Sequence, residues 1–305
     1  MRILLTGASG FIGTYLAREL SSSGHDVVGV DYVDGDLASP DVARHLISVN
    51  YPDLVVHLAA KVGRLFGEEN PGTTIGANAI ATTYVARVCG QENRRLVYVS
   101  TSEAFGDQGR HNVTERDPDA LPHNLYGLSK RWGEEAARLY APKGLQILRL
   151  SMPYGPGLPA GRGRAAVVTF LWQAHRRKPI TVHRNGHRCL CWIGDLIAGI
   201  RMIIEDSGAG IWTVGRNDNE TPMLEVAQIA CKLAGCPFDL ITEIDPPVKQ
   251  TLIKRLNVNR LSALGWQPRI GLRTGMSKTY EAVKLYDEDG MPPSGWGKMI
   301  GGKPE

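Results

Sequence analysis

Short apolar segments alternate with amphipathic stretches through the first half of the chain. Five runs rich in Leu, Val and Ile predict β-strands, at residues 2–6, 26–31, 54–60, 95–101 and 145–150. Three stretches with apolar residues at helical spacing predict α-helices, at residues 11–22, 73–91 and 126–141. Apolar strands separated by helices form a parallel sheet whose two faces are both covered. The pattern therefore predicts an α/β fold with a Rossmann-type, doubly wound parallel sheet.

The pattern changes after Leu150, where residues 153–164 are rich in Pro and Gly and predict a loop. Beyond it we expect short helices, at residues 165–177, 195–205, 222–234, 259–264 and 272–286. Short strands are expected at residues 180–183 and 211–214. We expect a Rossmann domain at 1–152, joined again by 186–215, and a smaller mixed C-terminal substrate domain at 153–185 and 216–286. Residues 287–305 are expected to form an irregular tail.

The composition excludes several classes of protein. Hydrophobic residues make up 43% of the 305 residues and charged residues 22%, as in an ordinary globular protein. The 35 Lys and Arg residues against 31 Asp and Glu give a net charge of only +4, so we expect no nucleic-acid partner. No apolar run reaches the about 18 residues of a membrane span, so we expect no membrane association. The first residues read as a strand rather than a signal peptide, and we expect a cytoplasmic protein.

Five cysteines are scattered along the chain without a C-x-x-C pair. Their odd number argues against a disulfide framework. Cys189 and Cys191 have no second Cys or His pair that would complete a tetrahedral metal site. We therefore expect free thiols and no metal.

A glycine-rich turn follows the first predicted strand, in the sequence Thr6-Gly-Ala-Ser-Gly-Phe-Ile-Gly13. Gly7, Gly10 and Gly13 have the spacing that allows a tight turn, a close approach of a pyrophosphate and close packing of helix on strand. The backbone N–H groups at the start of the following helix attract phosphates. In this strand–turn–helix context the glycines predict a dinucleotide-binding site.

The residues after the second strand indicate which dinucleotide binds. Asp31 stands where a carboxylate holds the hydroxyls of the adenosine ribose. The following Tyr32, Val33 and Asp34 include no arginine for a 2′-phosphate, and two carboxylates would repel one, so NAD is the expected cofactor. Asp36 and Leu37 are expected to flank the adenine.

Tyr126 and Lys130 lie four residues apart and therefore on one face of the predicted helix. A nearby ammonium favours the phenolate form, so we expect Lys130 to lower the pKa of Tyr126. A phenol tuned in this way can accept the proton of a substrate hydroxyl near neutral pH.

Taken together, these motifs resemble the extended short-chain dehydrogenase/reductase family, and within it the nucleotide-sugar epimerases, dehydratases and decarboxylases. The resemblance covers about residues 1–285. Besides the glycine turn and Asp31, it rests on Asp36-Leu37, HLAA at 57–60, Asn78, VSTSEAFG at 99–106, YGLSK at 126–130, YGPG at 154–157 and GHRCLCWIGDL at 186–196.

The resemblance implies a role for individual residues. Tyr126 would be the base, Lys130 would hold the nicotinamide ribose, and Thr101 would bind the reacting hydroxyl. The further residues implied to line the NAD site are Phe11, Ile12, Leu58, Ala59, Ala60 and Asn78. The family's usual partner is a second copy of the chain, through a pair of helices that forms a four-helix bundle, which implies a homodimer.

Ser102 and Glu103 bear on the type of reaction. Thr-Ser-Glu is similar to the motif of GDP-mannose dehydratases and UDP-glucuronate decarboxylases, whereas dehydratases of the deoxythymidine type usually have Asp-Glu after the Thr. A ketone at sugar C4 acidifies the C5 hydrogen, and Glu103 would act there. The alternative is that Glu103 is a solvated loop carboxylate.

Three cations are candidates for substrate binding. Arg188 occupies the position where relatives hold the substrate diphosphate, as its guanidinium fork suits. Arg162 would add positive potential, and Lys61 lies in a loop that resembles that of GDP-fucose synthases. Met152 replaces an Asn that in relatives contacts the phosphates, and its thioether cannot donate a hydrogen bond. The expected substrate is a nucleotide-diphosphate sugar.

The leading hypothesis is an NAD-dependent nucleotide-sugar epimerase or dehydratase that oxidises sugar C4 transiently and then returns the hydride. One alternative is a UDP-uronate decarboxylase. A second is an NAD(P)H-dependent keto-sugar reductase, which would consume its cofactor stoichiometrically. A third is a non-catalytic NAD-binding protein on the same fold.

Overall fold

The computed structural model describes residues 1–106, 114–115, 120–163, 165–206, 208–216, 220–247 and 256–296. Its main sheet has six strands in the order β2-β1-β3-β4-β5-β9, and every neighbouring pair is parallel. These strands are β1 (Arg2–Thr6), β2 (Asp26–Val30), β3 (Leu54–His57), β4 (Arg95–Thr101), β5 (Gln146–Leu150) and β9 (Gly210–Val214). The predicted doubly wound parallel sheet is confirmed.

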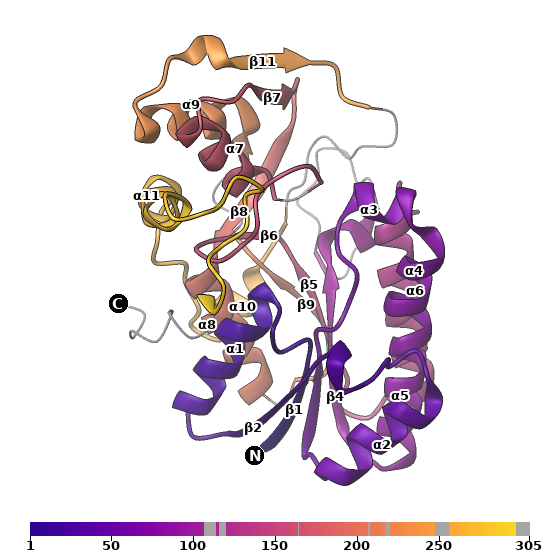
Figure 1. Cartoon of the computed structure of the whole chain (residues 1–305). Helices are drawn as coiled ribbons and strands as arrows, with labels where there is room; N and C mark the ends of the chain where they lie inside the picture. The colour runs from indigo at the N-terminus through magenta and orange to yellow at the C-terminus, as the bar shows by residue number, and fades with distance from the viewer. Residues whose placement is uncertain are drawn as a thin grey trace.

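Helices cover both faces of this sheet (Figure 1). One layer contains α2 (Pro40–Asn50), α5 (Ala81–Gln91) and α6 (Leu125–Tyr140), and the other contains α1 (Phe11–Ser22), α8 (Ile193–Glu205) and α10 (Asn259–Ser262). Successive residues of a strand point to opposite faces. Ile3 and Leu5 therefore enter the apolar cluster under α1 and α8, while Leu4 enters the cluster under α2 and α5.

A smaller mixed portion lies above the carboxyl ends of the strands (Figure 1). A three-stranded sheet joins β6 (Met152–Tyr154), β8 (His187–Trp192) and β10 (Glu220–Pro222), and β7 (Ile180–His183) pairs with β11 (Ile241–Ile244). The helices α7 (Ala166–His175), α9 (Met223–Ala234) and α11 (Leu272–Val283) pack together and enclose a separate apolar core. The remaining short elements are η1 (Tyr32–Asp34), α3 (Arg64–Glu69), α4 (Pro71–Ile75), η2 (Gly76–Ile80), η3 (Ser102–Phe105) and η4 (Phe238–Leu240).

Two predicted elements end or bend where the sequence pattern does not show it. The third strand was expected to reach residue 60, but β3 ends at His57 because the chain then turns beside Thr6. There the Thr6 carbonyl accepts from Leu58 N at 3.2 Å and the Thr6 hydroxyl accepts from Ala59 N at 3.2 Å. The helix expected at 73–91 begins at Pro71 and contains a π-helical turn, η2, between α4 and α5.

All five cysteines lie in the described part of the chain, where they are buried and form no disulfide. Burial raises the pKa of Cys89 to about 12, so its thiol stays protonated and unreactive. Within the described ranges, no helix combines the length and the hydropathy that a bilayer span needs. Of the C-terminal tail, only the part up to Trp296 lies within the described residues.

A buried ion pair ties α6 to the sheet. The side chains of Arg149 on β5 and Glu134 on α6 are both fully enclosed, and Arg149 binds Glu134 through Nη2 at 2.6 Å and Nε at 2.9 Å. The Ser100 hydroxyl donates a further hydrogen bond to Glu134. The guanidinium also stacks on the Phe105 ring, with its central carbon 4.2 Å from the ring centroid. Arg131 and Arg138 lie 3.9 and 3.6 Å from the same carboxylate, so Glu134 is the centre of a cluster of cations.

Replacing Glu134 with Gln should destabilise the protein severely, because it removes the carboxylate charge that binds the buried guanidinium of Arg149. We expect a loss of about 3–5 kcal/mol in the free energy of unfolding. Glu135→Gln is the matched control, since Glu135 is 54% exposed and forms surface pairs worth about 0.2–1 kcal/mol. Urea unfolding followed by tryptophan fluorescence measures both, and equal effects of the two substitutions would contradict this assignment.

Candidate active site

The glycine turn after β1 has no room for side chains at two of its glycines. Gly7 has φ of +75°, and a Cβ there would lie 2.8 Å from the backbone nitrogen of Ala59. A Cβ on Gly13 would collide with the carbonyl oxygen of Gly7. Gly10 precedes α1 and offers no side-chain cap to its first N–H groups. The turn thus presents bare backbone and the positive end of α1 to a ligand, which fits the phosphates of a dinucleotide.

Asp31 lies at the edge of the same turn. Its carboxylate accepts a hydrogen bond from the backbone nitrogen of Ser9 at 2.9 Å, which fixes it beside the glycines. Asp36 accepts from the backbone of Ala38 at 2.9 Å, and Leu37 is buried in the apolar core under α2. The side chain of Leu37 therefore contributes to the core, while Asp31 stays within reach of a ligand in the turn. These residues fit NAD.

Tyr126, Lys130 and Thr101 come together where β4 ends and α6 begins. Tyr126 is in the first turn of α6, whose N-cap Asn124 accepts from the backbone nitrogen of Gly127 at 2.9 Å. The hydroxyl of Tyr126 forms a hydrogen bond with that of Thr101, the last residue of β4. Lys130 is 2% exposed, and its Nζ lies 4.3 Å from the centre of the Tyr98 ring.

The environment keeps the phenol of Tyr126 protonated in the protein alone. Burial and the charge of Glu103 raise its pKa to about 12, although the hydrogen bond with Thr101 opposes the shift. Burial lowers the pKa of Lys130 to about 7, with Glu134 opposing. Our expectation that Lys130 lowers the pKa of Tyr126 is therefore wrong for the protein without ligands. The physical reason is desolvation, which disfavours both the phenolate and the ammonium.

Glu103 belongs to the site rather than to a solvated loop. It is half-buried in η3, and its Oε2 accepts from the Nδ2 of Asn124 at 3.2 Å. Its charge raises the pKa of Tyr126 and opposes the lowering of the pKa of Arg188 that burial causes. Ser102 is half-buried beside it at the start of η3.

Asn78 holds the loop after β3 against α6. It is buried in η2, where its Oδ1 accepts from Lys61 N at 2.8 Å and its Nδ2 donates to Lys61 O at 2.9 Å. The Nδ2 also donates to the Ser129 hydroxyl at 3.0 Å. These bonds fix the backbone of Leu58, Ala59 and Ala60 beside the glycine turn.

The three predicted substrate cations lie in different settings. Arg188 on β8 is largely buried and donates to the carbonyl of His187 at 2.7 Å. Lys61 is exposed. Arg162 is 80% exposed and forms an ion pair of 2.9 Å with Glu69 of α3, so its guanidinium is engaged with a protein carboxylate.

One residue near the site, Arg64, was not predicted to contribute. Arg64 begins α3, and its charge acts on Arg188. No motif marks Arg64, because only the fold brings α3 toward β8. Met152 on β6, where relatives have Asn, packs against the apolar core of the C-terminal portion. Its side chain therefore serves packing and not phosphate binding.

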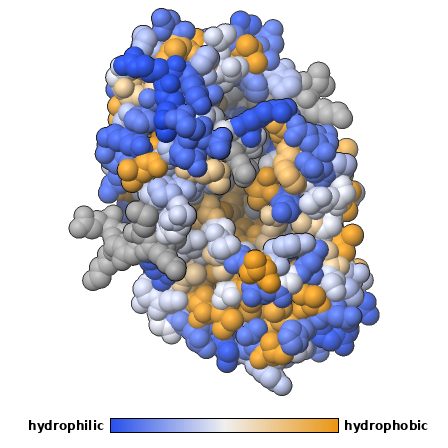
Figure 2. All heavy atoms as spheres, viewed as in Figure 1, coloured by the Kyte–Doolittle hydropathy of each residue, from blue (hydrophilic) through white to orange (hydrophobic). Residues whose placement is uncertain are grey.

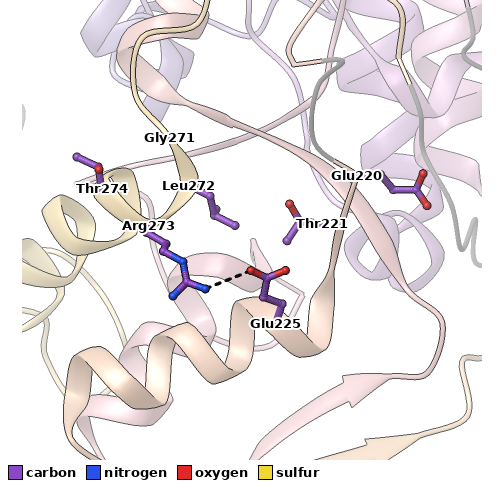
Figure 3. Close-up of a pocket in the computed structure, with 7 residues that line it drawn as sticks. All are labelled: Glu220, Thr221, Glu225, Gly271, Leu272, Arg273 and Thr274. Carbon is purple, nitrogen blue, oxygen red and sulfur yellow. Dashed lines mark ion pairs between the residues drawn. The ribbon is translucent and has the colours of Figure 1, made fainter.

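Figure 2 shows a hollow on this face, between the C-terminal elements above and the Rossmann sheet below. A different pocket lies between β10, α9 and the start of α11 (Figure 3), and none of the predicted site residues is among the seven that line it. There Arg273 and Glu225 form an ion pair of 3.5 Å between two exposed side chains. Tyr126, Lys130 and Thr101 thus lie outside this pocket.

Comparison with known proteins agrees with this geometry. Residues 3–215 match the family described as NAD dependent epimerase/dehydratase family. The chain is 28% identical to UDP-glucuronic acid decarboxylase 2 of Arabidopsis thaliana, over 90% of this chain and 66% of that protein. It is also 28% identical to UDP-glucuronic acid decarboxylase 6 of the same plant, over 93% of this chain and 89% of that protein.

Among solved structures, MoeE5 in complex with UDP-glucuronic acid and NAD superimposes with a TM-score of 0.81. It is 25% identical, and the match covers 92% of this chain and 98% of that one. The family match spans the glycine turn, Thr101, Tyr126, Lys130 and Arg188. The chain is therefore an enzyme that belongs to the NAD dependent epimerase/dehydratase family.

Proposed function

We propose that the enzyme oxidises C4 of a UDP-hexuronic acid and releases the C6 carboxylate as carbon dioxide. The observation that carries the proposal is the hydrogen-bonded pair of hydroxyls on Tyr126 and Thr101, with Lys130 one turn along the same helix and Glu103 beside them. The relatives named as UDP-glucuronic acid decarboxylases, and the neighbour solved with UDP-glucuronic acid, support a uridine diphosphate and a uronic acid.

The residues of the chain divide the work as follows. When bound, NAD accepts the C4 hydride and later gives it back, so there is no net redox change. Gly7, Gly10 and Gly13 provide the bare backbone for its pyrophosphate, with the N–H groups of Phe11 and Ile12, and Asp31 holds the adenosine ribose.

At the reacting carbon, Thr101 orients the C4 hydroxyl and Tyr126 accepts its proton. Lys130 holds the nicotinamide ribose. Burial raises the pKa of Tyr126, so proton removal at neutral pH needs a positive charge near the phenol, which the nicotinamide ring of NAD would supply.

The choice among reactions rests on the neighbours of Tyr126. Oxidation at C4 turns a uronic acid into a β-keto acid, whose C5–C6 bond breaks without an acid catalyst on C6. Carbon dioxide leaves, the electron pair forms the C4 enolate, and C5 then takes a proton that derives from solvent. A 4,6-dehydration needs a group that protonates the leaving hydroxyl, and Ser102 stands where dehydratases of the deoxythymidine type carry an Asp. Arg188, with Arg64 near it, would hold the anionic part of the substrate. The second candidate is 4-epimerisation of the same substrate, in which the hydride returns to the opposite face of C4 and C5 is not touched.

We also propose a division of labour along the chain. Residues 1–152 with 186–215 would bind NAD, and residues 153–185 with 216–286 would bind the sugar nucleotide. In support, β9 completes the main sheet, whereas α7, α9 and α11 enclose a core of their own.

A homodimer is supported by an apolar stripe on the outer face of α6. Leu128, Trp132 and Leu139 lie on one face of the helix, and Trp132 and Leu139 are 44% and 71% exposed. Ile80, at the start of the adjacent α5, is 43% exposed. A second copy of the same helix pair would bury this stripe in a four-helix bundle.

Tyr126→Phe should abolish turnover of UDP-glucuronic acid while the protein still binds NAD. Loss of a general base costs about 10²–10⁴-fold in rate, and we expect kcat to fall within that range. Tyr51→Phe is the matched control, because Tyr51 is 71% exposed on the far side of α2. A Tyr126→Phe enzyme as fast as wild type would contradict the mechanism.

The same assay identifies the reaction when products are read by NMR in deuterated water. We expect a UDP-pentose that carries deuterium at C5, with no accumulation of NADH. A UDP-uronic acid inverted at C4 would support the epimerase instead, and stoichiometric cofactor consumption would indicate a keto-sugar reductase.

The stability of the ligand-free protein should depend on pH through Lys130. Folding lowers its pKa from 10.5 to about 7, so the unfolded chain binds this proton more tightly. The free energy of unfolding should therefore decrease as the pH falls from 10 to 7. The difference in unfolding free energy between wild type and Lys130→Met should grow with pH in that window. Lys143→Met, at an exposed position, should follow wild type, and a flat difference for Lys130→Met would contradict the shift.

Leu139→Asp should convert the dimer to a monomer, because it places a charge at the most exposed position of the apolar stripe. Phe238→Asp is the control, since Phe238 is 47% exposed but lies on η4 of the C-terminal portion. Light scattering after size exclusion measures both. A wild-type monomer, or a Leu139→Asp dimer, would rule out this interface.

A further inference from the structure

The loop from Gly155 to Gly163 contacts the helix that follows the NAD turn. The hydroxyl of Tyr15 on α1 donates to the carbonyl of Pro156 at 2.9 Å. A Cβ on Gly155 would lie 3.6 Å from the ring of Phe11, so the loop backbone passes directly over the start of α1. One end of the loop is therefore held on the cofactor side of the site.

The other end of the loop contacts α3, on the side of the catalytic tyrosine. Arg162 pairs with Glu69 at 2.9 Å, and a Cβ on Gly63 would lie 3.3 Å from the carbonyl oxygen of Gly163. The helix α3 in turn packs on the start of α6, where Glu68 accepts from the backbone nitrogen of Leu125 at 3.0 Å. A Cβ on Gly67 would lie 3.2 Å from the backbone nitrogen of Tyr126. The loop thus links α1 to the helix that abuts Tyr126.

The C-terminal segment Tyr286–Trp296 fastens the middle of this loop. The hydroxyl of Tyr286 accepts from Gly157 N at 2.8 Å, and the carbonyl of Gly290 accepts from Ala160 N at 2.9 Å. The indole of Trp296 lies directly against Gly157, where a Cβ would collide with it, and meets the ring of Tyr286 edge to face at 6.3 Å. Gly157 has φ of +87°, so both its conformation and its neighbour require glycine.

The segment is itself anchored to α7. Trp172 donates from its indole nitrogen to the carbonyl of Asp287 at 3.1 Å, and Arg176 donates to the carbonyl of Tyr286 at 2.8 Å. The carboxylate of Asp287 accepts from the backbone nitrogens of Asp289 and Met291, which closes the segment into a compact turn. The C-terminal segment therefore holds the loop against α7.

We infer that Trp296 is a positioning residue, which holds the Gly155–Gly163 loop across the mouth of the site so that α1 and α3 keep the spacing a sugar nucleotide needs. The inference rests on the proposed function for its substrate, but the contacts do not depend on it. Among the described residues the buried indole nitrogen of Trp296 has no acceptor. The size of the indole, and not its N–H group, therefore holds the loop in position. A phenylalanine at residue 296 should hold the loop equally well.

The test compares Trp296→Ala, Trp296→Phe and, as a control for loss of an exposed aromatic side chain, Phe238→Ala. For Trp296→Ala we expect the KM for the sugar nucleotide to rise about 10-fold with kcat changed by less than about 3-fold, because binding contacts are misplaced while the catalytic groups stay in position. Trp296→Phe and Phe238→Ala should both keep the wild-type KM.

Limited trypsin digestion gives a second readout that needs no substrate. Cleavage after Arg162, identified by mass spectrometry, should be about 10-fold faster in Trp296→Ala than in the other three proteins, since a released loop opens more often. An unchanged KM and cleavage rate in Trp296→Ala would overturn the inference. A lower kcat, a higher KM and a lower melting temperature in both Trp296 variants alike would also overturn it. If the cleavage pattern holds but no UDP-hexuronic acid is turned over, the proposed function fails while the clamp stands.

Discussion

The ion pair between Arg149 and Glu134 joins the elements that carry the catalytic side chains. Glu134 lies on α6, one turn beyond Lys130, and Arg149 lies on β5. Ser100, which completes the cluster, directly precedes Thr101 at the end of β4. Because these enclosed polar groups satisfy one another, they favour one position of α6 against the strand ends. The hydrogen bond between Tyr126 and Thr101 depends on that position.

Burial also explains the protonation states of Tyr126 and Lys130. A dry site strengthens every charge interaction within it, but it also disfavours isolated charges. Tyr126 and Lys130 are consequently both pushed toward their neutral forms in the protein alone. His57 shows the same effect deeper in the sheet, where it bonds to the hydroxyls of Thr6 and Thr82 and burial lowers its pKa to about 3. It is a packed strand residue.

Sequence reasoning succeeded where the signal was local. The strand–turn–helix of residues 2–22 and the Tyr126–Lys130 spacing each lie within one short segment, and both elements formed as predicted. The strands β6, β8 and β10 were missed because β6 and β10 have only 3 residues each and all three strands are stabilised by partners distant in the chain. The pKa of Tyr126 was mispredicted for a related reason, since burial comes from the tertiary fold and leaves no trace in a motif. The ion pair of Arg162 with Glu69 likewise joins a loop to the end of α3, which lie far apart in the sequence.

The π-helical turn at Gly76–Ile80 has a consequence for how this region tolerates length changes. It contains one more residue per turn than an α-helix, so the segments before and after it are rotated by about 100° relative to a continuous helix. Deleting a single residue there would give a regular helix with better internal hydrogen bonding. It would also swing Asn78 away from Lys61 and Ser129 and release the loop beside the glycine turn. The π-helical turn weakens the helix locally, but it keeps Asn78 in the position from which it holds the loop beside the glycine turn.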